Sequence, residues 1–147
     1  SEEFAIMSDI AEKTLIPLEK EIELCQKHIQ IMRYRKEVDY IFEVENMPEG
    51  EMIPPATLHT IIENGITHNL PNEQNEVKMI LRFEENNLSK IYTLQTFGKN
   101  RPNIHKKKGG TGMKYIQSRL TESYGDQWRL DSKAFEMGWE TTITLVK

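Results

Sequence analysis

Residues 53–69 read Ile53-Pro54-Pro55-Ala56-Thr57-Leu58-His59-Thr60-Ile61-Ile62-Glu63-Asn64-Gly65-Ile66-Thr67-His68-Asn69. Apolar residues recur at the i, i+3, i+4, i+8 spacing of an amphipathic helix, at Leu58, Ile61, Ile62 and Ile66. The two prolines favour an extended approach and a preset φ for the first helical turn. The stretch therefore predicts a half-buried helix around which the rest of the chain is organised.

Gly65 falls inside the apolar stripe of this helix, where glycine costs about 1 kcal/mol relative to alanine. We therefore expect something flat to pack against the helix backbone there. Asn64 and His68 lie one turn apart along the edge of the stripe. An Asn beside a Glu, at Asn64 and Glu63, on a helix with a glycine notch indicates the edge of a nucleotide pocket. On this motif alone a simpler interpretation stays open, in which Glu63 and Asn64 are solvated and His68 is a satisfied, half-buried histidine.

The composition is that of one soluble globular domain, because 147 residues can bury a core and 37% are hydrophobic against 29% charged. The net charge of −4 gives no general argument for a membrane or nucleic-acid partner, and we expect no nucleic acid. A single cysteine, Cys25, excludes an internal disulfide framework and a cysteine-based zinc site. The first residues read as the middle of a helix, so we expect the chain to be cut from a longer protein.

A long helix is predicted near the N-terminus from one apolar seam, formed by Leu15, Leu18, Ile22, Cys25, Ile29 and Met32. We place its start near Leu15, with Pro17 in its first turn. The seam is compatible with a dimer contact or with packing on a sheet, and packing on a sheet is favoured for a single domain. We accordingly divide the chain into an N-terminal helical segment, 1–36, and a domain, 37–147.

Alternating apolar residues predict strands over 38–44, 77–83, 88–96, 128–132 and 141–146, with 77–83 and 88–96 forming an antiparallel hairpin. Residues 97–110 are predicted to be loop throughout, and a loop of that length is usually functional. It ends in Gly109-Gly110-Thr111-Gly112 at the start of a further helix, where backbone N–H groups converge well on an anion. A flexible linker that ends at a helix cap is the alternative.

Three groups of residues together resemble the ATP-binding domain of LytS-type sensor histidine kinases. Ile53-Pro54-Pro55 with Ile62-Glu63-Asn64-Gly65-Ile66-Thr67-His68 is similar to that family's N box. Gly110-Thr111-Gly112-Met113, followed by Arg119-Leu120 and Tyr124-Gly125, resembles its G2 box and the helix after it. Residues 17–24, with Met32-Arg33, resemble the helix that precedes the family's ATPase domain. The resemblance covers Leu15 to Val146 in the family's order and spacing.

The resemblance implies an α+β fold, a two-layer α/β sandwich of the Bergerat ATP-binding type. In that fold a mixed sheet is covered on one face by helices, and here a long N-terminal helix leads into it. The nucleotide would lie between the helix that carries Asn64 and a lid formed by residues 97–110. ATP and Mg²⁺ are the implied cofactors.

The same resemblance implies a role for each motif residue. Asn64 would give a side-chain oxygen to Mg²⁺, and Glu63 would act as a base or orient the attacking group in phosphoryl transfer. The other residues implied to contact the nucleotide are His68, Thr96, Gly98, Gly110, Thr111, Gly112 and Met113.

One departure from the family pattern lies after the third predicted strand, where the family has Asp-x-Gly-x-Gly and its Asp accepts a hydrogen bond from adenine. Here the segment reads Gln95-Thr96-Phe97-Gly98-Lys99-Asn100. Thr96 falls closest to the Asp position, with Gln95 as an alternative acceptor. A hydroxyl in place of a carboxylate predicts weaker ATP binding and poor discrimination between ATP and GTP.

Two function classes follow. The first is the catalytic ATP-binding domain of a two-component sensor histidine kinase, which passes the γ-phosphoryl group to a histidine outside this chain, so that the fragment alone does not autophosphorylate. The second is a degenerate ATPase-like domain that serves as a dimerisation or interaction scaffold. The kinase class implies a response regulator, an acceptor-histidine segment of the same protein, a homodimer at full length, and a cytoplasmic position in a membrane-anchored protein.

Overall fold

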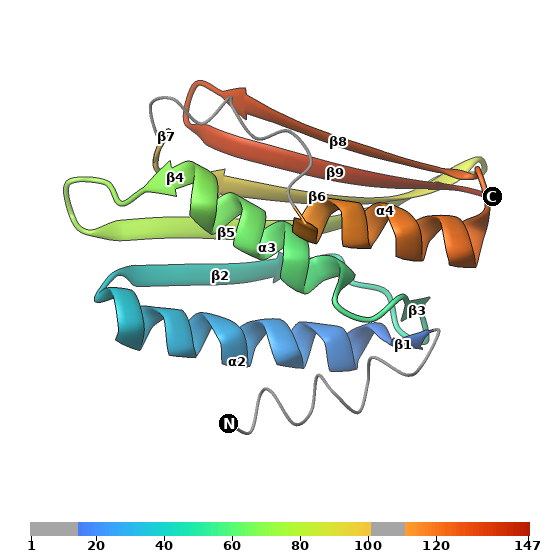
Figure 1. Cartoon of the computed structure of the whole chain (residues 1–147), viewed down its shortest axis with the longest axis horizontal. Coiled ribbons are helices and arrows are strands. Elements are labelled where there is room, and N and C mark those ends of the chain that lie inside the picture. The colour runs from blue at the N-terminus through green and yellow to red at the C-terminus, as the bar shows by residue number, and fades with distance from the viewer. Residues whose placement is uncertain (1–14, 101–110) are drawn as a thin grey trace.

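The computed structural model describes residues 15–100 and 111–147, which form a mixed sheet with helices on one face (Figure 1). The elements are β1 (Ile16–Pro17), α2 (Leu18–Lys36), β2 (Asp39–Glu45), β3 (Met52–Ile53), α3 (Thr57–His68), β4 (Asn69–Leu70), β5 (Glu76–Glu85), β6 (Ser89–Phe97), β7 (Lys99–Asn100), α4 (Thr111–Tyr124), β8 (Trp128–Phe135) and β9 (Gly138–Val146). The main sheet has the order β2-β5-β6-β9-β8. Its β2–β5 pair is parallel and its other pairs are antiparallel. The predicted α+β sandwich and the hairpin of β5 and β6 are confirmed.

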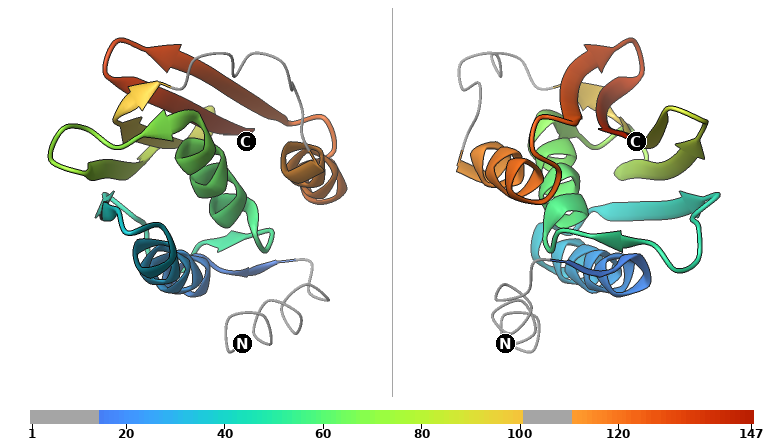
Figure 2. Two further views of the ribbon diagram at one scale, coloured as in Figure 1. Left: turned by 60° about the vertical axis from the view of Figure 1, so that its left-hand side comes forward. Right: turned by 90° about the vertical axis from the view of Figure 1, so that its right-hand side faces the viewer.

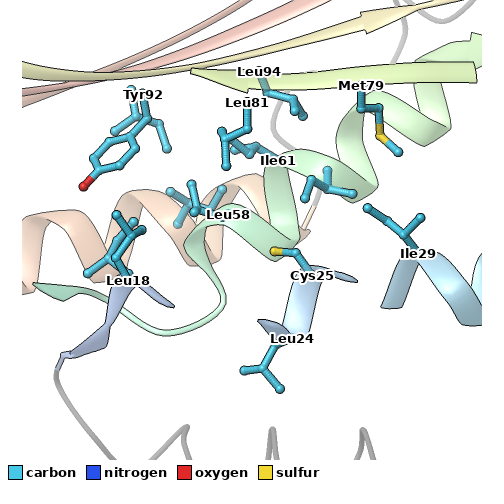
Figure 3. Packing of buried hydrophobic residues seen from close by; sticks show 14 of the residues in the cluster. Leu18, Leu24, Cys25, Ile29, Leu58, Ile61, Met79, Leu81, Tyr92 and Leu94 are labelled. Carbon is cyan, nitrogen blue, oxygen red and sulfur yellow. The ribbon is translucent and has the colours of Figure 1, made fainter. Parts of the chain in front are cut away.

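The core lies between the sheet and the helices, as Figure 3 shows. Strand alternation turns Met79 and Leu81 of β5, and Tyr92 and Leu94 of β6, toward this layer, and all four are nearly inaccessible to solvent. Helix α3 runs between α2 and α4 (Figure 2) and buries the predicted stripe of Leu58, Ile61, Ile62 and Ile66. The periodicity of residues 58–66 was therefore interpreted correctly.

The N-terminal helix starts later than predicted. Leu15 is exposed, Ile16 and Pro17 form the short strand β1 paired with β3, and α2 begins at Leu18 with Pro17 as its N-cap. The predicted start near Leu15 was wrong because proline fixes an extended entry here instead of the first helical turn. The prediction that this helix packs on the sheet is confirmed, since α2 contacts β2 as well as α3.

Two further boundaries differ from the sequence predictions. Pro54 and Pro55 precede α3, which begins at Thr57 after Ala56, a residue with a positive φ of 67°. The predicted loop 97–110 was wrong at its start, because Phe97 ends β6 and β7 pairs with β4. Residues 101–110 of that predicted lid, including Lys106 to Lys108, lie outside the described residues.

The N-terminus of α3 is capped by a carboxylate from α2. Alanine has no side-chain oxygen, so Ala56 cannot satisfy the first N–H groups of α3 in the usual way. Glu21 is fully buried and accepts from Ala56 N at 3.0 Å, Leu58 N at 2.8 Å and His59 N at 3.3 Å. Burial raises the pKa of the Glu21 carboxyl, while the three backbone hydrogen bonds oppose that rise. Glu21 thus joins the first long helix to the central one.

No helix among residues 15–100 and 111–147 combines the length and the apolar character that crossing a bilayer requires.

Replacing Glu21 by glutamine is expected to lower the free energy of unfolding by about 1–3 kcal/mol. The amide keeps one acceptor oxygen but sets an NH₂ group against the N–H groups of α3. Urea denaturation of the parent and of Glu21→Gln measures the change. The matched control is Glu23→Gln on the exposed side of α2, where Glu23 pairs with Lys20 and Lys27 at the surface and its loss should have little effect. Equal stability of the two variants would contradict the capping role.

Candidate functional site

Strand β6 approaches α3 at Gly65. A Cβ atom on Gly65 would collide with Oγ1 of Thr96 and would lie 3.3 Å from Thr96 Cβ. Thr96 is fully buried at this contact. The sequence predicted that something flat packs against the helix backbone at Gly65, and that partner is the end of the sheet. The contact places Thr96 directly beside the helix that carries Asn64 and His68.

Gly65→Ala is expected to destabilise the domain although alanine favours helix. Overpacking costs about 1–3 kcal/mol, against a gain of about 1 kcal/mol in helix propensity. In a Thr96→Ala background the obstructing hydroxyl is gone, and the same substitution should become neutral or stabilising. A double-mutant cycle from urea unfolding measures the coupling, expected within about 0.5–3 kcal/mol. Additive effects would show that the two residues do not press on each other.

Buried polar atoms without hydrogen-bond partners gather at this end of α3. Within residues 15–100 and 111–147 they include Asn64 Nδ2, Asn69 Oδ1, Thr96 Oγ1 and Trp139 Nε1. A buried polar atom left unpaired costs about 1–3 kcal/mol, and most such atoms in folded proteins have a partner. The residues at this site therefore fit a polar ligand that supplies both donors and acceptors.

His68 and Trp139 form one wall of the same site. Their rings are stacked with centroids 3.8 Å apart and planes at 6°. Trp139 also pairs in register with Thr96 across β6 and β9. The sequence prediction began this strand at Thr141 and so left Trp139 out. Extending the alternation of Thr141 and Ile143 back by one step would have placed Trp139 on the core-facing side.

Gly98 and Asn69 close the end of the site. A Cβ on Gly98 would lie 2.6 Å from the carbonyl oxygen of Leu70 and 3.5 Å from Asn69 Cβ. Asn69 donates from Nδ2 to the carbonyl of Gly65 at 2.9 Å. Gly98 therefore holds the chain after β6 against the chain after α3.

The G2-box residues are partly described. Helix α4 begins at Thr111 and continues through Gly112, and Met113 is half-buried against the core. Gly110 lies outside the described residues. The predicted end of this helix is confirmed, because Gly125 has a φ of 63° and donates to the carbonyl of Thr121 at 2.8 Å.

Glu63 points away from this site, toward α2. Its Oε1 accepts a hydrogen bond from Nε2 of His28, whose ring lies 4.2 Å from that of His59. The bond from His28 lowers the pKa of the Glu63 carboxyl, partial burial opposes that effect, and the charges of His28, His59 and Lys36 lower it further. The structure thus places Thr96 against α3 at Gly65, next to Asn64, and Gly98 against the chain after α3. It directs Glu63 elsewhere.

Because its folded pKa lies below the ordinary 4.5, Glu63 contributes stability above that pH and loses it as pH falls through the folded pKa. We expect Glu63→Gln to flatten the decline of unfolding free energy between about pH 6 and about pH 3. Urea denaturation across that range measures it. The pKa of Glu21 is raised, so its effect on the pH dependence of stability is opposite in sign to that of Glu63. Because Glu21 is present in both proteins, this effect cancels in the comparison. An unchanged slope in Glu63→Gln would argue against the pairing.

No group of three or more His, Cys, Asp or Glu side chains in the described ranges could hold a metal ion. A groove of about 560 Å³ lies on the opposite face of the sheet and reaches Gly98 at one end. It is lined in part by Ile41, Lys78 and Ile80, which alternate with the core-facing residues of β2 and β5. The polar cluster beside α3, which this groove does not include, is therefore the stronger candidate for chemistry.

Comparison with solved structures identifies the fold. The catalytic domain of the histidine kinase ThkA superimposes with a TM-score of 0.61 at 14% identity, over 90% of this chain and 95% of that one. The histidine kinase AdeS of Acinetobacter baumannii gives a TM-score of 0.65 at 12% identity, over 99% of this chain and 75% of that one. The chain has the fold of a histidine kinase catalytic domain. ThkA in complex with the response regulator protein TrrA matches with a TM-score of 0.58 at 14% identity, over 90% of this chain and 41% of that one.

Curated relatives of this chain are sensor proteins. It is 36% identical over 63 residues to the sensor protein LytS of Oceanobacillus iheyensis, covering 42% of this chain and 11% of the relative. It is 20% identical over 148 residues to LytS of Staphylococcus saprophyticus, covering 92% of this chain and 25% of the relative. The chain thus spans a quarter or less of the length of these relatives. No protein-family model matches it. The predicted resemblance to LytS-type histidine kinases is confirmed.

Proposed function

We propose that this domain binds Mg-ATP and presents its γ-phosphoryl group to a histidine outside the described chain, as the catalytic part of a two-component sensor kinase. The observation that carries the proposal is the cluster of buried, unpartnered polar atoms beside α3, formed by Asn64, Asn69 and Thr96. In a chain with the histidine kinase catalytic fold, that cluster lies along the helix whose motif predicted nucleotide binding. A ligand with many hydrogen-bonding groups would satisfy it.

Each residue of the site has a distinct task in this proposal. Asn64 would hold the metal ion through its side-chain oxygen, and Thr96 would face the base from the floor of the site. His68 would flank the nucleotide, Gly98 would keep the end of β6 close to α3, and backbone N–H groups at the start of α4 would face the phosphates. Mg²⁺, when bound, would neutralise charge on the transferred phosphoryl group.

The role of Glu63 as a base stays a prediction. Its carboxylate is engaged by His28 on α2, and that hydrogen bond would have to break before Glu63 could reach an attacking group. Glu63 is therefore better suited, in this arrangement, to fixing α3 against α2.

The remaining parts of the proposal concern the longer protein. A response regulator is the proposed recipient of the phosphoryl group, by analogy with the ThkA–TrrA complex. The acceptor histidine, the homodimer and a cytoplasmic position in a membrane-anchored protein are proposed from the likeness to LytS, of which this chain spans 25% or less.

Asn64→Ala is expected to abolish the Mg²⁺-dependent rise in melting temperature that ATP produces in the parent, because the metal loses its protein oxygen ligand. Circular dichroism should be unchanged, since Asn64 lies at the edge of the core. Asn87→Ala, in the exposed turn between β5 and β6, is the matched control and should respond as the parent does. Isothermal calorimetry with and without Mg²⁺ gives the affinities.

Two outcomes would count against this proposal. An undiminished ATP response in Asn64→Ala would remove Asn64 from the metal site. If the parent binds no nucleotide at millimolar Mg-ATP, the domain does not work as a kinase module, and the scaffold function replaces it.

A further inference from the structure

Trp139 stands between two residues that the proposed function assigns to the nucleotide. Its indole stacks flat on His68, with ring centroids 3.8 Å apart. Its backbone pairs in register with Thr96, whose side chain reaches the backbone of α3 at Gly65. A planar, two-ring aromatic side chain therefore lies against His68, on the same face of the sheet as Thr96.

The indole of Trp139 fits this place in shape, but its polar N–H group has no matching partner there. The two near-parallel rings lie in van der Waals contact over their faces. However, the indole N–H is buried and has no acceptor among the described residues, and the hydroxyl of its neighbour Thr96 is equally unpaired. A side chain selected only to fill the core would not bring a donor to a place without an acceptor. The missing hydrogen bonds indicate that Trp139 occupies this position only while no ligand with matching polar groups is bound.

A purine has the same planar, fused two-ring shape as indole, and in addition carries ring nitrogens and an exocyclic group that form hydrogen bonds. In the place of the indole it would stack on His68 and offer a partner to the hydroxyl of Thr96. Trp139 is half-buried, so its side chain can rotate out while its backbone stays paired with Thr96 and Ala134. It is the second residue of β9, directly after the β8–β9 hairpin turn, where Met137 is 62% exposed.

We propose that Trp139 is the affinity-determining gate of the base-binding end of the site: its indole fills the place of the purine, and nucleotide binding displaces it. This inference rests on the proposed function. In the open state the indole of Trp139 has left the place of the purine. If this state is a minor one, the apparent dissociation constant equals the intrinsic constant divided by the fraction of open protein. Trp139 then weakens nucleotide binding without touching the phosphates or the metal.

The first test removes the gate. Trp139→Ala should bind Mg-ATP on the order of tenfold more tightly than the parent in isothermal calorimetry, because the open fraction rises toward one. Trp128→Phe is the matched control. Trp128 lies on β8, donates from Nε1 to Thr121 Oγ1 at 3.1 Å, and should leave the affinity unchanged. Circular dichroism and melting temperature establish that both variants are folded.

The second test observes the gate directly and does not depend on Trp139→Ala being stable. The chain has two tryptophans, so in Trp128→Phe all tryptophan emission comes from Trp139. Saturating Mg-ATP should shift that emission to longer wavelength as the indole leaves the buried position. Inorganic phosphate, which has no base, should not produce the shift.

The outcomes separate this inference from the function on which it rests. Nucleotide binding in the parent, with a weaker affinity in Trp139→Ala, would overturn the gate and make Trp139 a stacking platform. Unchanged Trp139 emission at saturating nucleotide would also overturn it, while leaving the proposed function intact. Failure of both the parent and Trp139→Ala to bind any nucleotide would defeat the proposed function and this inference with it.

Discussion

The arrangement of the site depends on the buried carboxylate of Glu21. Helix α3 begins after Ala56, whose side chain offers no acceptor, and its first N–H groups are satisfied by Glu21 across the interface with α2. A negative charge at a helix N-terminus is also favoured by the helix dipole. Because the acceptor comes from another element, α3 is oriented as well as capped: the carboxylate fixes where the helix starts and hence which residues reach the sheet.

The close approach of α3 to β6 is the second constraint, and it follows from a missing side chain. Gly65 costs helix stability, yet any Cβ there would strike Thr96. The sheet end, with Thr96 and its register neighbour Trp139, can therefore lie directly under the second half of α3. Polar atoms of Asn64, Asn69 and Thr96 are buried in this region without a hydrogen-bond partner among the described residues.

The sequence alone was sufficient to predict the elements whose apolar residues recur with a regular period. The 3.6-residue period located α3, and alternation located β5 and β6, since both patterns extend over several residues. It was insufficient for Glu21, because a charged residue in a helix predicts exposure and its partners, beginning with Ala56, lie 35 residues further along. The pairing of β4 with β7 is two residues long and leaves no period to detect. Trp139 was missed for a similar reason, since it lies at the end of a strand, and its significance comes from a stacking partner on another element.

Glu63 and Asn64 are consecutive residues of α3, but their side chains face different neighbours. A rotation of about 100° per residue sends Glu63 toward His28 on α2 and leaves Asn64 beside the polar cluster. Together with Glu21 at the helix start, the Glu63–His28 bond ties α3 to α2 at two points more than a turn apart. Two such ties fix the rotation of α3 about its own axis, and so determine which of its residues face the sheet. That orientation keeps Gly65 against Thr96 of β6 and His68 against Trp139 of β9.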